Sequence, residues 1–351
     1  MTAAEGVLAI MWVGLTAYAL FGGADFGAGF WELLAGGTER GRAPRRLIEH
    51  SIGPVWEANH VWLIFVLVVL WTSFPPAFAA IASTLYIPLT LAALGMIARG
   101  SAFAFRHSVD QPALQQLFGA SFAFSSVATP FFLGTIAGAV ASGRVPPGIA
   151  TGDVISSWLN PTSVLGGVIA VGVCAFLAGV YLCADAQRGD DTTLVEYFRV
   201  RALVSAVVVG AVALAGIAVL RVDAAALFDG LISRGLPLII ASAAAGIGAI
   251  VSLARRRFGM ARVAAALAVT AVIWGWALAQ FPYLLQPQLT IAAAAAPAAT
   301  LRAMLISLVV GAALLVPSLI FLFTLFQRAE ASTAITPSGR TARPPRPGPR
   351  R

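Results

Sequence analysis

The sequence predicts an all-α integral membrane protein with about nine transmembrane helices, and three observations lead to this prediction. Of its 351 residues, 59% are hydrophobic and only 11% are charged, whereas charged residues make up about a quarter of an ordinary soluble domain. Runs of about 20 apolar residues recur along the chain, each long enough to cross a bilayer. The basic residues, which are all arginine, are unevenly distributed among the segments that join these runs.

The apolar runs give nine candidate spans. They lie near residues 6–35, 53–73, 77–98, 118–141, 163–185, 202–220, 235–253, 262–283 and 303–326. The N-terminus, MTAAEG, lacks the positive region of a signal peptide, so we expect the first run to be a retained span. A faint likeness between the first and fifth runs suits a protein built in two halves. For the fold class we also expect two four-helix bundles plus one peripheral helix.

The arginines predict the orientation of the spans. The odd-numbered loops and the C-terminal tail hold 19 of the 23 arginines, with Arg99 and Arg106 assigned to the third loop, and the even-numbered loops hold 4. Cytoplasmic loops of membrane proteins carry an excess of basic residues. The sequence therefore places the N-terminus outside and the C-terminus in the cytoplasm, an arrangement that nine spans satisfy.

The domain organisation follows from the same pattern. Residues 1–328 form a single polytopic transmembrane domain, and residues 329–351, rich in proline and arginine, form a disordered basic cytoplasmic tail. The pI near 10.6 reflects this topology and contact with anionic lipid headgroups. Nucleic-acid binding is not expected, because no folded soluble module remains to present the charge.

Polar residues at the start of the second span are the strongest functional signal. The segment GPVWEANHVWLIFVLVVLWTSFPPAF, residues 53–78, carries Trp56, Glu57, Asn59 and His60 in its first turns. A carboxylate in hydrocarbon costs at least about 2.5 kcal/mol, so such acids usually face a protein interior or a water path. Glu57 and His60 are stacked neighbours on one face of a helix.

A second acid, Asp25, lies in the first span within the glycine-rich segment GGADFGAGF. Counting from the span ends at 1.5 Å per residue puts Asp25 roughly 15 Å deep and Glu57 roughly 6 Å deep. Two acids on consecutive helices mark a candidate proton route from the cytoplasm toward the bilayer centre. The alternative is that both acids hold helices together, for example through an arginine partner such as Arg99. Glu32, close to the predicted interface, is expected to snorkel or to contact a loop arginine.

The histidines and cysteines argue against a metal or haem site in this chain. A haem or metal site needs convergent ligands, and of His50, His60 and His107 only His60 is expected inside the membrane. Cys174 and Cys183 share one expected helix about 13 Å apart, too far for a disulfide.

These motifs resemble subunit II of the cytochrome bd quinol oxidase family, over nearly the whole chain to about residue 328. The resemblance rests on the following motifs: GADFGAGF, GPVWEANHVWLI, WTSFPPAF, RGSAFAFR at 99–106, LNP at 159–161 and FPYLLQP at 281–287. The motif that opens the second span is the most specific, since tryptophan, acid and asparagine before His-Val-Trp is not a generic membrane pattern.

The resemblance implies a multi-pass subunit in the bacterial cytoplasmic membrane. Its complex would oxidise quinol, reduce O2 to water and generate proton motive force without pumping. Two haems b and one haem d would belong to subunit I, an obligate partner. This chain would be haem-free; some members hold a structural quinone, and a small accessory subunit is a further expected partner. Glu57 and Asp25 would supply cytoplasmic protons, with His60 beside them, and Trp56, Asn59 and Arg99 would give polar support.

Two departures and two alternatives accompany the resemblance. Ala104 stands where many relatives carry an acid, and Glu57 replaces their aspartate. An ion-coupled secondary transporter could use the same two acids, since such folds often contain broken helices around a midplane site. A purely structural membrane subunit is the other alternative.

Overall fold

The computed structural model describes residues 2–36, 39–52, 56–106, 109 and 111–334. The chain divides into two compact units, residues 1–301 and 302–351, and each is described by itself. The helices and strands, in order, are α1 (Ala3–Ala17), the π-helical turn η1 (Tyr18–Gly22), α2 (Gly23–Leu33), α3 (Arg42–Ile52), α4 (Trp56–Ser73), α5 (Pro75–Thr84), α6 (Tyr86–Arg106), α7 (Pro112–Ala141), α8 (Pro161–Arg188), α9 (Thr192–Asp223), α10 (Ala225–Gly230), the π-helical turn η2 (Leu231–Gly235), α11 (Leu236–Ala254), α12 (Phe258–Gln280), β1 (Tyr283–Leu285), β2 (Leu289–Thr290), α13 (Ile291–Ala294) and α14 (Ala298–Ala334).

The structure is that of an all-α integral membrane protein, as the sequence predicts. Within the described residues, eight helical segments are long and apolar enough to cross a membrane, and a ninth arises if α4 and α5 count as one bent span. The first of them, Ala3–Leu33, runs through α1, η1 and α2 without interruption. The first and second strands form the one small antiparallel hairpin in the described residues, over the FPYLLQP motif.

The predicted third span, 77–98, was wrong at its start. Residues 75–84 form a separate short helix, α5, which bends by 119° from α4, and the span itself is α6. The break follows from Pro75 and Pro76, which begin α5 and lack the backbone N–H that would continue α4. Phe74, fully buried, caps the new helix in a non-helical conformation.

The assignment of Arg99 to the third loop was also wrong. Arg99 lies inside α6, and only 1% of it is exposed. Without Arg99, the predicted cytoplasmic side still carries 18 arginines and the other side carries 4, so the charge asymmetry is nearly unchanged. The orientation of the spans stays a prediction, and Arg99 becomes a residue of the protein interior.

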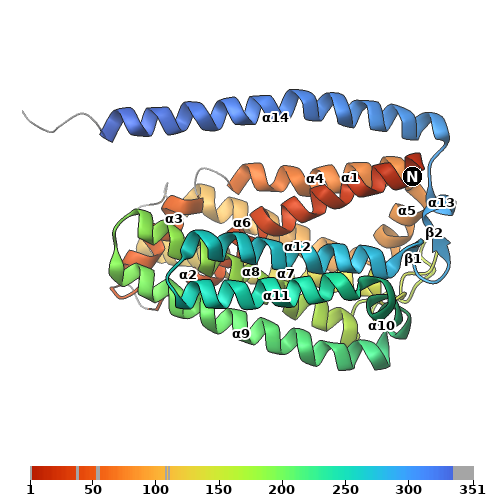
Figure 1. The fold of residues 1–351 in the computed structure, drawn as a ribbon, viewed down its shortest axis with the longest axis horizontal. Coiled ribbons are helices and arrows are strands. Elements are labelled where there is room, and N and C mark those ends of the chain that lie inside the picture. Colours follow the sequence, from red (N-terminus) through yellow and green to blue (C-terminus); the bar gives the residue numbers. More distant parts are fainter. Residues whose placement is uncertain (1, 37–38, 53–55, 107–108, 110, 335–351) are drawn as a thin grey trace, which may run out of the picture. The chain divides into compact units, whose positions relative to one another are not determined.

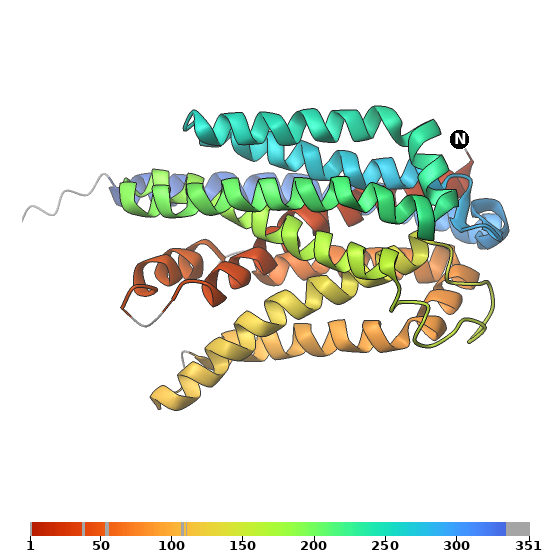
Figure 2. The ribbon, with the colours of Figure 1, turned by 90° about the horizontal axis from the view of Figure 1, so that it is seen from below.

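In the first unit, α8 is the central helix. It packs against α2, α7, α9 and α12. Figures 1 and 2 show α8 between α7 and α9, with α11 beside α12. The core around α8 contains Leu177 of α8 itself and one large apolar side chain from each of the four neighbouring helices, Trp31, Phe122, Phe198 and Phe258.

Small residues allow the close approach of these helices. A Cβ atom on Gly27 of α2 would collide with the backbone carbonyl of Cys174 on α8. Gly134 of α7 and Gly166 of α8 meet in the same way, each facing the carbonyl of the other. Glycine at such positions brings two membrane helices into backbone contact, where packing replaces the hydrophobic driving force that is absent in lipid.

The second unit contains the greater part of α14, which includes Pro317 in its interior. The expected arrangement of two four-helix bundles and a peripheral helix stays a prediction, and so does the domain boundary at residue 328. Residues 335–351, which make up most of the expected tail, lie outside the described residues.

Candidate functional site

A buried ion pair joins the first and third membrane segments of the fold. Arg99 Nη1 donates to Asp25 Oδ2 at 2.9 Å, and Nη2 donates to Oδ1 at 2.8 Å, so the guanidinium holds both carboxylate oxygens. Each side chain is only 2% exposed. Because a lone charge in this environment is strongly disfavoured, the two groups depend on each other for their burial.

Arg99 completes its contacts on two further elements. Its Nε donates to Ser126 Oγ on α7 at 2.9 Å, and Nη2 reaches the backbone carbonyl of Asp25 at 3.2 Å. The guanidinium also lies 4.6 Å from the ring centre of Phe122 and 5.0 Å from that of Phe26. The Arg99 guanidinium therefore contacts a carboxylate, a hydroxyl and two aromatic rings, and these contacts hold α2, α6 and α7 together.

A π-helical turn, η1, positions Asp25 within its span. The turn ends at Gly22, three residues before the carboxylate, and such bulges inside helices occur frequently at functional sites. Asn59 of α4 lies across from this turn, with its Nδ2 at 3.4 Å from the carbonyl of Phe21. The amide therefore contacts the backbone of the π-helical turn.

Tyr18, at the start of η1, contributes a buried hydroxyl to this region. Only 7% of the residue is exposed, and its Oη makes no hydrogen bond within the part of the chain that the structure describes. Its ring packs with Phe26 and Cys174 in a small apolar cluster. The hydroxyl of Thr129 on α7 is likewise buried and without a partner among the described residues. Buried hydroxyls usually make at least one hydrogen bond, often with ordered water.

His60 of α4 lies next to the ion pair. Its imidazole meets the ring of Phe26 edge-on, with 6.1 Å between the ring centres. Because Phe26 also contacts Arg99, only one aromatic ring separates the imidazole from the guanidinium. The structure thus brings together Asp25, Asn59, His60 and Arg99, which lie on three different membrane segments.

Glu57 and Trp56 occupy the first turn of α4, but their side chains lie outside the described part of the structure. Their backbone is helical, which places Glu57 one turn before His60 on the same face. Glu32 is buried, with only 6% of it exposed, and its expected contact with a loop arginine stays a prediction. Trp31 beside it donates from Nε1 to the carbonyl of Ala175 at 2.8 Å.

The described part of the chain offers little for a metal. Among the described residues, no group of three His, Cys, Asp and Glu side chains comes close enough to hold an ion. His107 lies outside the described residues, and His50 is exposed at the end of α3. Haem is a group that the resemblance assigns to the complex, and the described histidines do not fit a site with two axial ligands.

A second group of ionic contacts connects helix ends on one side of the first unit. Asp185 at the end of α8 pairs with Arg262 of α12, and Glu196 of α9 pairs with both Arg199 and Arg256. At the opposite ends of α8 and α9, Asp223 accepts hydrogen bonds from Arg144 and from both the backbone N–H and the hydroxyl of Thr162. These contacts fasten the termini of neighbouring helices.

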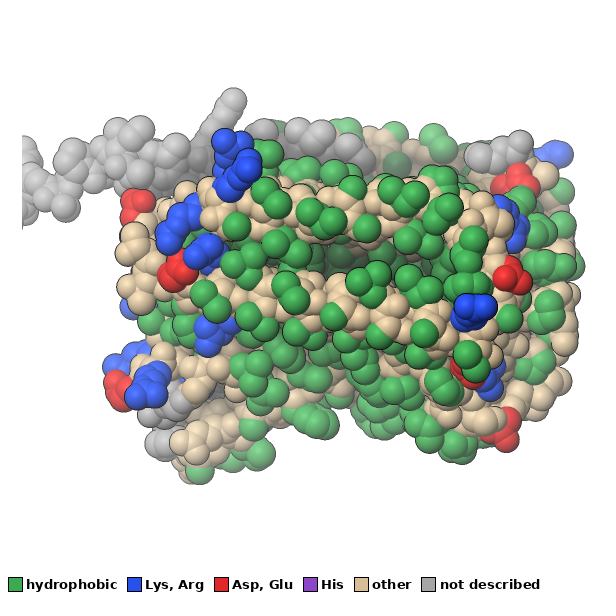
Figure 3. Space-filling model, turned by 60° about the horizontal axis from the view of Figure 1, so that its bottom comes forward, with side chains coloured by type: hydrophobic (Ala, Val, Ile, Leu, Met, Phe, Trp, Pro, Cys, Tyr) green, Lys and Arg blue, Asp and Glu red, His purple; other side chains and the backbone are tan. Residues whose placement is uncertain are grey.

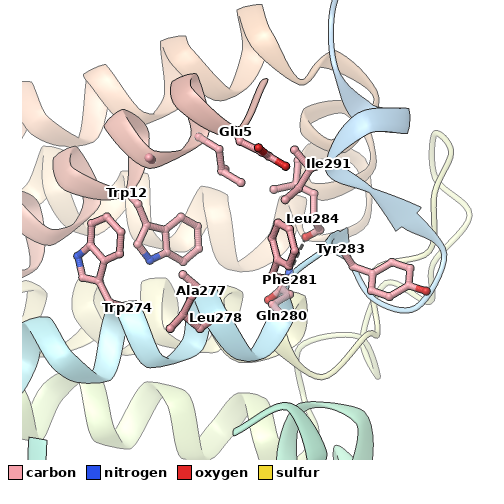
Figure 4. Close-up of a pocket in the computed structure, with 12 residues that line it drawn as sticks. Glu5, Trp12, Trp274, Ala277, Leu278, Gln280, Phe281, Tyr283, Leu284 and Ile291 are labelled. Carbon is pink, nitrogen blue, oxygen red and sulfur yellow. Dashed lines mark hydrogen bonds between the residues drawn. The ribbon is translucent and has the colours of Figure 1, made fainter. Parts of the chain in front are cut away.

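A pocket of about 140 Å³ opens between α1 and α12 (Figure 4). The indoles of Trp12 and Trp274 lie on one side of it, and Phe281, Leu284 and Ile291 lie on the other. Gln280 is buried but already donates to the carbonyl of Leu284 and accepts from Trp276. The space is well below the 300 Å³ usual for a small-molecule site, so we assign no quinone to it.

The loop between α7 and α8 contains a shifted acid outside the membrane spans. The backbone N–H of Ser156 donates to the Asp153 carboxylate at 2.6 Å, and that of Ile155 donates at 2.9 Å. These hydrogen bonds, that of Ser156 first, lower the pKa of Asp153 below its usual value. The carboxylate thereby stabilises the turn that leads into α8.

Several residues of the site are not evident from the sequence. Ser126 and Phe122 lie in an apolar run with no motif around them, and Tyr18 precedes the glycine-rich segment of the first span. The pair of serines at 125 and 126 inside a transmembrane segment is one hint of a polar contact on α7, and Thr129 one turn later is another.

The chain is similar to known membrane proteins over most of its length. The sequence model of the family described as cytochrome bd terminal oxidase subunit II matches residues 4–326. Cytochrome bd ubiquinol oxidase subunit 2 of Bacillus subtilis is 30% identical over 185 residues, which cover 52% of this chain and 53% of that protein. The aligned part therefore spans about half the length of this relative.

Two further comparisons cover nearly the whole chain. The putative cytochrome bd menaquinol oxidase subunit II of Bacillus subtilis is 23% identical over 333 residues, which cover 92% of this chain and 94% of that protein. The structure of bd oxidase from Geobacillus thermodenitrificans contains a similar chain, with a TM-score of 0.73 and 25% identity. That alignment covers 93% of this chain and 99% of the other.

Proposed function

This chain belongs to the cytochrome bd terminal oxidase subunit II family, and from this membership we propose that it is the haem-free subunit of a quinol oxidase that reduces O2 to water. It is a multi-pass protein of the bacterial cytoplasmic membrane. Its obligate partner would be subunit I, which would hold two haems b, haem d and the site of quinol oxidation. Those haems, when bound there, would supply the electron transfer, and this chain would contribute the scaffold and the protons.

The observation that carries the scaffolding role is the Asp25–Arg99 pair. It fixes three helices around one charged group in the interior, with Ser126 and two aromatic rings completing the contacts. Arg99 and Asn59 would give the polar support expected from the sequence. A subunit with such an internal fastening presents a rigid surface to its partner.

Proton supply would begin at Glu57 and continue past His60 toward Asp25. Glu57 and His60 share a face of α4, and His60 lies one aromatic ring away from the ion pair. Because the guanidinium pairs with both oxygens of Asp25, a proton that reaches this carboxylate would remove its negative charge and weaken the ion pair. The buried hydroxyl of Tyr18 would complete the route through ordered water.

Replacement of Glu57 by glutamine tests the proton role, because glutamine keeps the size of the side chain but cannot carry a proton. We expect the variant to assemble normally and to reduce O2 more slowly, with turnover lowered at least tenfold if Glu57 is the entry residue. Oxygen consumption by membranes and the reduced-minus-oxidised haem spectrum of the purified complex measure the two properties separately. Unchanged turnover in a fully assembled complex would leave only the scaffolding role.

Purification of this chain in mild detergent tests the complex itself. A larger co-purifying subunit with haem b and haem d absorbance would support the proposal. A stable, colourless preparation without a partner would contradict it, and transport driven by the same acids would then be the function to examine.

A further inference from the structure

The surface between α9 and α11 is hollowed. α9 packs chiefly on α8, and α11 packs chiefly on α12, so the two helices stand beside each other with limited direct contact. Figure 3 shows this hollow between the two helices, with hydrophobic side chains along both of its walls. We call the space between α9 and α11 the α9–α11 groove.

One end of the groove is basic. The turn between α11 and α12 presents three consecutive exposed arginines, Arg255, Arg256 and Arg257, and Arg199 lies beside them on α9. In the part of the chain that the structure describes, Arg255 and Arg257 have no ion pair. The adjoining ends of α8, α9, α11 and α12, with the turns between them, carry seven arginines, at 188, 199, 201, 255, 256, 257 and 262, and four acids, at 185, 190, 191 and 196. The end of the groove therefore has an excess of positive charge.

The turn between α11 and α12 has a left-handed backbone at Arg256. Arg256 has φ 58°, the left-handed conformation that glycine adopts most readily. The N–H of Arg257 bonds back to the carbonyl of Ser252, and that of Arg256 to the carbonyl of Leu253, which closes the end of α11. An arginine therefore occupies the position where glycine would suit the backbone best.

One face of α9 begins beside the turn that follows α11. Glu196 of α9 contacts Arg256, and the positions 196, 203 and 210 are spaced by seven residues, so they lie on the same side of the helix. Gly210 is exposed, and a Cβ atom built on it would meet no other atom within 4 Å. At 1.5 Å per residue, Gly210 lies about 21 Å from Glu196, roughly half of the full thickness of a membrane.

We propose that the α9–α11 groove binds an anionic phospholipid, with its phosphate on Arg255, Arg256 and Arg257 and an acyl chain lying along α9 as far as Gly210. Guanidinium groups bind phosphate through paired N–H donors, and the apolar walls of the groove suit a hydrocarbon chain of one leaflet. The arginine excess selects an anionic headgroup over a zwitterionic one.

The test uses the full chain, purified in mild detergent with its co-purifying subunits, and phosphatidylglycerol as the probe. Native mass spectrometry counts the phosphatidylglycerol retained, and phosphatidylcholine serves as the zwitterionic reference. We expect the unmodified protein to retain phosphatidylglycerol in preference. The triple variant R255Q/R256Q/R257Q should retain at least about tenfold less, since each arginine near a membrane surface contributes about a fivefold factor.

A matched control removes three positive charges from elsewhere on the predicted cytoplasmic side of the protein. The triple variant R40Q/R42Q/R46Q changes three other exposed arginines and should retain phosphatidylglycerol as the unmodified protein does. Arg256→Gly separates the lipid site from a purely structural turn. Glycine suits the left-handed backbone and should leave the fold intact. It removes one phosphate contact, together with the exposed ion pair to Glu196, and should lower retention severalfold.

Gly210→Phe tests the groove, with Gly210→Ala as its control. The phenyl ring should displace the acyl chain and lower retention, whereas the single methyl group should not. Equal loss in both arginine triples, equal retention of the two lipids, or unchanged retention in Gly210→Phe would each overturn the proposal. Cross-linking of Gly210→Cys to a partner subunit would overturn it as well, because protein and not lipid would then fill the groove.

Discussion

Removal of one partner from the Asp25–Arg99 pair should destabilise the protein far more than removal of both. In Arg99→Leu, the carboxylate of Asp25 stays 2% exposed and loses two charged hydrogen bonds, at 2.8 and 2.9 Å. Breaking a buried pair in this way costs about 3–5 kcal/mol, and one unpaired charge at the centre of a membrane helix costs about 2.5–3.5 kcal/mol. We expect a loss of about 3 kcal/mol, or roughly a hundredfold in the folding equilibrium.

The double variant Asp25→Leu with Arg99→Leu should recover most of this loss. Two apolar side chains leave no buried charge, and replacement of a buried ion pair by hydrophobic residues is often neutral for stability. Ser126 would lose the donor from Arg99 but would keep its own hydrogen bond to the carbonyl of Phe122, at 2.6 Å. The four proteins of this cycle therefore separate the coupling of the pair from the packing of its members.

Thermal unfolding of the complex in detergent gives the stability of each protein, and oxygen consumption gives its turnover. A double variant that is stable but slow would show that the pair serves turnover beyond holding the helices. If the double variant is as unstable as either single variant, or if Arg99→Leu is as stable as the unmodified protein, the reasoning from buried charge is refuted.

Two further predictions concern other parts of the fold. Gly27→Val should prevent the contact of α2 with α8, because even a Cβ atom there collides with the carbonyl of Cys174, and should cost at least about 2 kcal/mol. The control is Gly119→Ala, because a Cβ atom at Gly119 meets nothing within 4 Å, and it should leave the yield of folded protein unchanged. An equal loss of folded protein in Gly27→Val and Gly119→Ala would contradict this account. The lowered pKa of Asp153 means that its stabilisation of the loop is present above the unfolded pKa near 3.8 and is lost as pH falls through the lower, folded value. At neutral pH the carboxylate is charged, so hydrogen exchange at the amides of Ile155 and Ser156 should be faster in Asp153→Ala than in the unmodified protein at the same pH. Equally slow exchange in the two proteins would contradict the role of the carboxylate.

The sequence by itself determined the class of the protein and the approximate position of most membrane segments, the third span excepted. Hydrophobicity and helical length are local properties, so runs such as 163–185 and 235–253 find their counterparts in α8 and α11. The cost of a carboxylate in hydrocarbon also singled out Asp25 before any fold was known, and it suggested Arg99 as one partner among the alternatives.

Only the tertiary structure decided what Asp25 contacts. Arg99 is 74 positions away in the sequence, and Ser126 is a further 27 beyond Arg99, so their meeting depends on how α2, α6 and α7 pack. The same holds for the break at Phe74. Two prolines indicate an interruption, but whether the chain then begins a new span or first bends by 119° depends on the space left by neighbouring helices. Local pattern fixes which segments enter the membrane, whereas close packing decides which polar groups meet inside it.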